Sequence, residues 1–207
     1  MHKNSYPGRF IVFEGLDGSG KTLQAELLAK YLHEEKKHVL LTCEPTLDGR
    51  EAQKIQDVLE HKLQMDPKGL QKLFSEDRRE HLDRIIPELQ KGTIVISDRY
   101  FFSTFAYGAL KVPLEELIAM NEDFILPDST FVLDLDPKIC IERIDARRME
   151  GRDVQAEFFE KEDKLRKVRE GYYSLKTRFP ELMFIDGDRT PHEIHEDIVT
   201  KLKNILE

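Results

Sequence analysis

A glycine-rich run near the N-terminus has residue types suited to binding phosphate. The run is Gly15-Leu16-Asp17-Gly18-Ser19-Gly20-Lys21-Thr22, which fits the pattern G-x-x-x-x-G-K-[ST]. Glycines allow backbone N–H groups to turn inward around polyphosphate oxygens, and a following helix N-terminus adds partial positive charge. In such a loop Lys21 reaches the β- and γ-phosphates and the Thr22 hydroxyl coordinates Mg²⁺. The pattern predicts a site for a nucleoside triphosphate with Mg²⁺, and it leaves kinase, GTPase and motor open.

A second set of charged residues follows the apolar run at 94–97. Asp98 and Arg99 come directly after this run and are followed by Tyr100. At the carboxyl end of a parallel strand, Asp98 can hold Mg²⁺ through water, and Arg99 can clamp a second phosphate with two N–H groups. The alternative is a surface ion pair. No Asn-Lys-x-Asp pattern, which would read guanine, occurs in the sequence, so a GTPase is disfavoured.

An aromatic residue and an arginine indicate a nucleotide as the second substrate. Phe74 and Arg78 are one helical turn apart, so they share a helix face. The ring can stack on a base while the guanidinium donates to a base carbonyl. Taken alone, the pair is more typical of a core aromatic residue beside an exposed charge.

The segment at 143–152 is basic in an otherwise acidic chain. Its arginines are Arg143, Arg147, Arg148 and Arg152, set against Asp145 and Glu150. Arginines that close over phosphates would stabilise the charge in transfer, as an arginine finger supplied from the same chain does. The alternative is a pair of solvated helices, which is the usual meaning of such charge runs.

Short apolar runs alternate with long amphipathic ones. Runs rich in Val, Ile, Leu and Phe indicate buried strands at 9–14, 38–43, 93–98, 130–135 and 183–186. Helical patterns lie at 21–35, 67–91, 114–124, 154–179 and 191–206. This alternation predicts an α/β fold, a doubly wound five-stranded parallel sheet with helices on both faces.

Prolines and glycines mark where these helices begin and end. Asp66 before Pro67 predicts an N-cap with proline at the first helical position. Pro87 predicts a kink or a restart in the long helix, which Gly92 then ends. Pro137 and Pro191 are expected to open two later helices.

Composition limits the class of protein. The 207 residues include 32 Lys and Arg against 40 Asp and Glu, a net charge of −8, which disfavours a general binder of nucleic-acid polymers. The length suits a single domain at 1–207. No apolar run is long enough for a membrane span, and no signal peptide is recognised, so a cytoplasmic protein is expected. Cys43 and Cys140 are expected to be buried thiols, and the seven histidines, His81 among them, to lie on the surface.

Together these motifs resemble the thymidylate kinases, P-loop enzymes that phosphorylate dTMP with ATP. The likeness rests on the run at 13–24, the base-binding stretch Leu73-Phe74-Ser75-Glu76-Asp77-Arg78, and Asp98-Arg99-Tyr100 followed by Ser103-Thr104-Phe105-Ala106-Tyr107. It extends through the strand pattern at 127–135 and the helix at 137–143. The resemblance implies a nucleoside monophosphate kinase fold with a short arginine-bearing lid at about 143–153, and a homodimer.

The resemblance also implies a role for individual residues. In the dTMP site, Asp17 bonds the sugar 3′-hydroxyl, Phe74 stacks on thymine, Arg78 bonds a base carbonyl and Arg99 grips the phosphate. Ser103 belongs to the same site, Thr104 contacts the base, Tyr107 favours deoxyribose and Tyr172 closes the site. In the ATP site, the loop from Gly15 to Thr22 holds the phosphates, Arg143 stacks on adenine, and Gly187 and Asp188 lie at the adenine pocket.

Departures from the family pattern bear on catalysis. Gly18 stands where some thymidylate kinases have an arginine inside the loop, so the compensating charge is expected from Arg147, Arg148 or Arg152, acting with Lys21 and Arg99. Gly108 stands where many members have glutamine after the tyrosine. Arg50 is a candidate to replace an arginine that, in the family, commonly contacts the acceptor phosphate.

The expected reaction is transfer of the γ-phosphate of ATP to dTMP, giving dTDP and ADP in dTTP synthesis, with Mg²⁺ as cofactor. One alternative is a deoxynucleoside kinase, in which Glu44 would act as base on a 5′-hydroxyl. Another is a nucleotide-binding regulator without a small acceptor.

Overall fold

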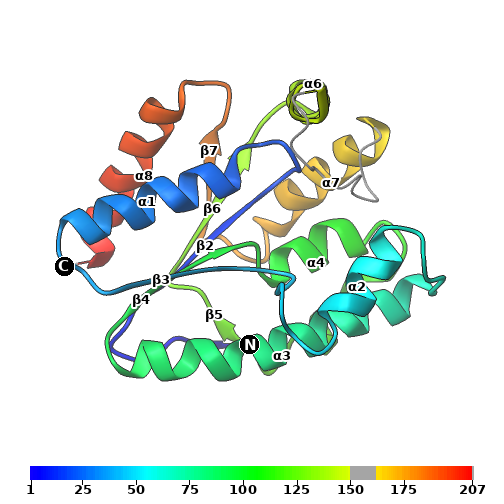
Figure 1. The fold of residues 1–207 in the computed structure, drawn as a ribbon, viewed down its shortest axis with the longest axis horizontal. Coiled ribbons are helices and arrows are strands. Elements are labelled where there is room, and N and C mark those ends of the chain that lie inside the picture. The colour runs from blue at the N-terminus through cyan, green and yellow to red at the C-terminus, as the bar shows by residue number, and fades with distance from the viewer. Residues whose placement is uncertain (150–161, 207) are drawn as a thin grey trace.

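The computed structural model describes residues 1–149 and 162–206, and its centre is a five-stranded parallel sheet. The strands are β2 (Phe10–Gly15), β3 (Val39–Cys43), β4 (Ile94–Asp98), β6 (Ser129–Asp134) and β7 (Leu182–Asp186). Their order across the sheet is β3-β4-β2-β6-β7, and every pairing is parallel. The predicted sheet is confirmed, and β2, which carries the glycine-rich loop, lies at its middle (Figure 1).

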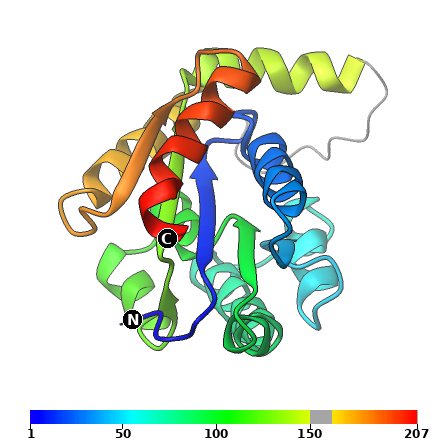
Figure 2. The same cartoon turned by 90° about the vertical axis from the view of Figure 1, so that its left-hand side faces the viewer.

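Helices cover both faces of this sheet. The eight helices of the described residues are α1 (Lys21–Glu34), α2 (Ala52–Leu59), α3 (Pro67–Gln90), α4 (Phe101–Gly108), α5 (Leu114–Met120), α6 (Pro137–Met149), α7 (Glu162–Leu175) and α8 (Pro191–Leu206). Figure 1 shows α1 and α8 on one side of the sheet and α3, α4 and α7 on the other. Figure 2 turns the side with α8 (red) and α1 (blue) toward the viewer, and α8 packs against α1 and β7. The strands β1 (His2–Lys3) and β5 (Ile125–Leu126) pair in parallel as a separate two-stranded sheet.

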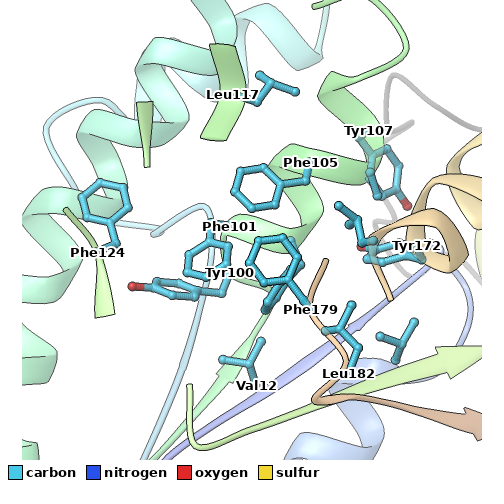
Figure 3. Packing of buried hydrophobic residues seen from close by; sticks show 14 of the residues in the cluster. Val12, Tyr100, Phe101, Phe105, Tyr107, Leu117, Phe124, Tyr172, Phe179 and Leu182 are labelled. Atoms are coloured by element: carbon cyan, nitrogen blue, oxygen red, sulfur yellow. The ribbon is translucent and has the colours of Figure 1, made fainter. Parts of the chain in front are cut away.

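Alternation along β2 builds the two halves of the core. Ile11 and Phe13 face α1 and α8, whereas Phe10 and Val12 face the helices of the other side, and all four are fully buried. An internal strand of a parallel sheet is covered on both faces, so its sequence is continuously apolar. In the larger half of the core, the ring of Phe105 on α4 stacks on that of Phe179 beyond α7, with 5.9 Å between the ring centroids (Figure 3). This aromatic packing holds α4 against α7 and β2.

Helix ends follow the predicted capping, with one exception. The Asp66 side chain accepts a hydrogen bond from the Gly69 N–H at 2.9 Å, with proline at the start of α3. However, α3 continues through Pro87 to Gln90 as one helix, so the predicted restart is wrong. Ile85 and Leu89 on either side of Pro87 are fully buried, and their packing offsets the lost hydrogen bond.

Other differences concern short or partly described elements. The sequence pattern did not predict α2 or α4, and the predicted helix at 114–124 ends at Met120. The helix predicted at 154–179 corresponds to α7, and its first part lies outside the described residues. Cys140 is buried as predicted, but Cys43 is only half-buried, because the strand that carries it is at the sheet edge. None of the helices described here has the length and apolar character to cross a membrane.

Candidate active site

The glycine-rich loop connects β2 to α1 and turns through left-handed backbone conformations. Gly15, Gly18 and Gly20 have φ of +136°, +84° and +99°, a region that side chains with a Cβ rarely adopt. A Cβ on Gly18 would lie 2.4 Å from the carbonyl oxygen of Cys140, so the loop rests on the first turn of α6. No side chain caps the N-terminus of α1, which leaves its first N–H groups available to an anion.

Lys21 is folded back into this loop. It is buried, and its Nζ donates to the carbonyl of Leu16 at 2.8 Å and lies 4.0 Å from Asp17 Oδ1. A cation held inside a ring of backbone N–H groups is suited to polyphosphate. The structure therefore brings together the loop residues that the sequence pattern assigned to the triphosphate.

Thr22 and Asp98 meet where α1 begins and β4 ends. The Thr22 hydroxyl donates to Asp98 Oδ2 at 2.5 Å, and the other carboxylate oxygen of Asp98 is buried without a hydrogen-bond partner among the described residues. A hydroxyl and one carboxylate, with further sites left to waters and phosphate oxygens, match the usual protein contribution to a Mg²⁺ site. The donor set fits the cation that the sequence pattern predicted.

Arg99 lies between the loop and a neighbouring cavity. Its guanidinium pairs with Asp17, donates to Ser103 Oγ at 2.7 Å and to the Gly15 carbonyl at 3.3 Å, and lies 5.2 Å from the centre of the Tyr107 ring. The residue has a φ of +72°, which is unfavourable for a side chain other than glycine. Backbone strain of this kind persists where the surrounding contacts hold the residue in one conformation, and such residues are frequent at functional sites.

Glu14, at the end of β2, accepts hydrogen bonds from residues next to Arg99. Its buried carboxylate accepts from the N–H of Tyr100 at 2.9 Å, from the N–H and Oγ of Ser103 at 3.1 and 2.6 Å, and from the Tyr172 O–H at 2.8 Å. Burial raises the pKa of Glu14, although Arg99 and these hydrogen bonds act to lower it. Sequence reasoning missed this residue, and the available signal was a carboxylate within an otherwise apolar strand.

The cavity beside Arg99 collects nearly all the residues assigned to the acceptor. Its lining includes Asp17, Phe74, Arg78, Arg99, Ser103, Thr104 and Tyr107. Tyr107 O–H donates to Asp17 Oδ2 at 3.2 Å, which joins α4 to the loop. Tyr172 is buried beneath the cavity, in contact with Glu14 and with Ser103 Oγ at 3.2 Å. Sequence reasoning did not assign Pro45, Leu59, Gln71 and Tyr100 to the site, and it considered Glu44 only as the base of the deoxynucleoside kinase alternative.

Arg78 is buried, so the alternative of an exposed charge is wrong. Its Nε donates to Glu44 Oε2 at 2.7 Å, one terminal nitrogen donates to Asn121 Oδ1 at 2.5 Å, and the other donates to Thr104 Oγ1 at 3.2 Å. Only 2% of the residue is exposed. A buried guanidinium needs such partners, because an unpaired buried charge is strongly unfavourable.

His81 corrects the prediction that the histidines lie on the surface. It is 2% exposed, with Nε2 2.6 Å from Thr42 Oγ1 and Nδ1 3.1 Å from Glu44 Oε1. The buried Arg78–Glu44 pair needs a second polar partner for the carboxylate, and His81, one turn along α3, provides it. His195 is half-buried, and burial lowers its pKa, while His33, His61 and His192 are exposed as expected.

A further cluster lies at the carboxyl end of β6. Arg169 of α7 donates to both oxygens of Asp134, at 2.6 and 2.9 Å, and the Tyr173 O–H donates to the same carboxylate at 2.5 Å. Burial acts to raise the pKa of Asp134, but hydrogen bonds from Arg169 and Tyr173 hold it below its ordinary value. The cluster joins α7 to the carboxyl end of β6, the strand next to β2.

The remaining predicted residues are only partly placed. Arg143 is half-buried on α6, and Gly187 follows β7, where its N–H donates to the Asp134 carbonyl at 2.8 Å, with Asp188 next to it. The Arg147 and Arg148 side chains and the whole of Arg152 lie outside the described residues. Arg50 is on the surface with its side chain 87% exposed beside Glu80, and it does not line the cavity.

Comparisons with known proteins agree with this geometry. Residues 13–198 match the family described as thymidylate kinase. A protein named probable thymidylate kinase from Thermococcus kodakarensis is 37% identical over 95% of this chain and 98% of its own length. One of the same name from Pyrococcus abyssi is 38% identical over 96% and 98%, and a thymidylate kinase from Desulfotalea psychrophila is 35% identical over 97% and 96%.

Proposed function

Because the chain belongs to the thymidylate kinase family, we propose that it transfers the γ-phosphate of ATP to dTMP, giving dTDP and ADP. The observation that supports this most directly is the position of Arg99. Its guanidinium contacts Gly15 and Asp17 of the loop on one side and lines the acceptor cavity on the other. A phosphate in the cavity would therefore face the phosphates held by the loop.

The loop from Gly15 to Thr22 is the proposed binding site for the ATP phosphates. Its N–H groups and Lys21 would hold the β- and γ-phosphates. Arg143 is the proposed partner for adenine, with Gly187 and Asp188 at the end of the neighbouring strand. Thr22 and Asp98 would hold Mg²⁺, which neutralises charge on the transferred group when bound.

In the acceptor cavity, each side chain has a proposed task. Phe74 offers a ring for the base, and Arg78, held by three partners, offers N–H groups at a fixed position. Arg99 would donate to the acceptor phosphate, and Asp17 would accept from the sugar 3′-hydroxyl. Tyr107, bonded to Asp17, would close the space beside the sugar.

This chemistry requires positioning rather than a general base. The acceptor is a phosphate monoester with a second pKa of about 6, so it is mostly a dianion at neutral pH. Catalysis then rests on in-line placement and on charge neutralisation by Lys21, Arg99 and the arginines at 147, 148 and 152. These three arginines are proposed to act from the lid at about 143–153.

The structure weakens the deoxynucleoside kinase alternative. That reaction needs a base for a 5′-hydroxyl, and Glu44 was the candidate. Glu44 accepts from Arg78 at 2.7 Å and lies 3.1 Å from His81, so its carboxylate is committed to a buried ion pair. The acceptor cavity likewise argues against a regulator without a small acceptor. The family resemblance further supports a cytoplasmic homodimer that acts on free nucleotides rather than on polymers.

A coupled assay of ADP formation tests the proposal. With ATP and Mg²⁺, the acceptors dTMP, dUMP, dCMP, dGMP and thymidine are compared at equal concentrations. The expected result is the highest kcat/KM with dTMP. A preference for thymidine would support the deoxynucleoside kinase instead, and turnover of ATP that no acceptor accelerates would support the regulator.

A further inference from the structure

We propose that Gln71 is a specificity-determining residue of the acceptor site, whose side-chain amide pairs with the imide edge of the base. The proposal rests on the dTMP kinase activity proposed above and adds a residue to it. Gln71 lies on α3 one turn before Phe74 and two turns before Arg78. Residues at this spacing share a helix face, and all three line the acceptor cavity.

The side-chain amide of Gln71 has no hydrogen-bond partner among the described residues. The residue as a whole is only 5% exposed, and it lines the acceptor cavity. An amide at the wall of a cavity is left to water or a ligand to satisfy, so it is available to a base bound there. Gln71 is also the only amide side chain in the described lining of the cavity.

Gly108 on α4 makes room for this amide. A Cβ at that position would lie 2.9 Å from Gln71 Oε1 and 3.0 Å from its Cδ, closer than side-chain contacts normally allow. Gln71, Tyr107 and Gly108 also line a second cavity of about 320 Å³. Gln71 therefore borders both cavities, and its amide makes no hydrogen bond to the described residues.

The chemistry of thymine calls for such a group. Its pairing edge has an N3–H donor beside carbonyl acceptors, and the guanidinium of Arg78 has donors only. Asp17 and Glu44, the carboxylates of the cavity, are already paired with arginines. A primary amide both accepts and donates, so Gln71 can take the N3–H with Oε1 and give an N–H to the adjacent carbonyl.

The test measures binding of dTMP and of its N3-methyl derivative, which lacks the N3–H, by calorimetry. Wild type is compared with Gln71→Met, which keeps length and volume but loses hydrogen bonding, and with Gln90→Met, an exposed glutamine on the same helix. Loss of the pair should raise the Kd for dTMP about three- to tenfold in Gln71→Met and leave the Kd for the N3-methyl compound unchanged. In turnover, KM for dTMP should rise with kcat held within about twofold, and the Gln90 variant should match wild type.

Gly108→Ala provides an independent variant in which Gln71 is still present. The added Cβ should displace the amide and reduce the preference for dTMP over its N3-methyl derivative in the same direction. If both variants keep the wild-type preference while phosphorylating dTMP normally, the role of Gln71 is refuted and the kinase activity stands. If wild type does not phosphorylate dTMP, the proposed function itself fails. Circular dichroism and thermal unfolding establish whether each variant is folded. If Gln71→Met is unfolded, the preference measured with Gly108→Ala decides the role of Gln71.

Discussion

Tyr172 donates its phenolic O–H to Glu14 at 2.8 Å, which joins α7 to the strand that carries the phosphate loop. Both side chains are fully buried, and Ser103 contacts both of them. Ser103 in turn receives an N–H from Arg99 at 2.7 Å. One buried network therefore connects Arg99 to α7.

Replacing Tyr172 with phenylalanine should weaken this network. The loss of a buried hydrogen bond to a charged group should lower the free energy of unfolding by about 1.5–3 kcal/mol, and KM for dTMP should rise. Urea unfolding and steady-state kinetics measure the two effects. Tyr31→Phe is the control, because the Tyr31 ring contacts His195 but its hydroxyl makes no hydrogen bond within the described chain. Equal stability of the two variants would contradict the role of the Tyr172–Glu14 contact.

Glu14 should make stability depend on pH in an unusual direction. Burial raises its pKa in the folded state above the ordinary value of 4.5, so the folded protein binds this proton more tightly than the unfolded chain. Its favourable contribution is complete below pH 4.5 and is lost as pH rises through the raised pKa. The difference in free energy of unfolding between wild type and Glu14→Gln should therefore shift against wild type from pH 4.5 upward. A difference that is constant across this range would rule out the raised pKa.

Gly18 and Gly20 form a matched pair for testing the loop. Both have positive φ, so alanine at either costs about 1–2 kcal/mol in backbone strain. A Cβ at 18 would also meet the Cys140 carbonyl at 2.4 Å, whereas a Cβ at 20 meets nothing within 4 Å. Gly18→Ala should therefore destabilise the protein more than Gly20→Ala and weaken ATP binding more. Chemical denaturation and nucleotide titration measure both, and equal losses would show that contact with α6 is unimportant.

Arg78→Lys should impair recognition of dTMP and leave ATP unaffected. Lysine cannot reproduce the three directed contacts to Glu44, Asn121 and Thr104, and it would leave buried acceptors unpaired. KM for dTMP should rise at least about tenfold, with KM for ATP unchanged. The neighbouring Arg79→Lys is the control, because its side chain is 59% exposed. An unchanged KM for dTMP in Arg78→Lys would exclude Arg78 from the base site.

The lid arginines can be tested by single alanine substitutions at Arg147, Arg148 and Arg152. At least one should lower kcat about tenfold, which corresponds to ~1.4 kcal/mol of transition-state stabilisation. Arg166→Ala is the control, since this arginine is exposed on α7 and pairs with Asp163. If all three variants keep wild-type kcat, the charge in transfer is neutralised by other groups.

Periodicity predicted the sheet and the long helices because those elements depend on local pattern. The run at 9–14 is apolar on both faces, and α3 has a proline and a capping aspartate at its start. In contrast, α4 was missed because its sequence FFSTFAYG is rich in aromatic residues, which have modest helix propensity, and ends in glycine. Its helix is stabilised by tertiary packing of Phe102 and Phe105 against Phe179, which is distant in sequence.

The site was predicted where motifs identify residues and missed where partners are distant in sequence. Asp17, Phe74 and Arg99 line one cavity as expected. The buried status of His81 depends on Glu44, 37 positions away, and nothing local to His81 indicates it. Gln71 likewise becomes notable only when α4 places Gly108 against it.

The central position of β2 has a consequence for synthesis of the chain. Phe10 pairs opposite Val95, and Ile11 opposite Ser129, so neither neighbour of the strand exists until much later in translation. At about 5–20 residues per second, the first partner strand emerges roughly 4 to 17 s after β2. During that interval the strand that is buried along its whole length in the native sheet is without its final neighbours, and its apolar side chains are accessible to chaperones at the ribosome exit.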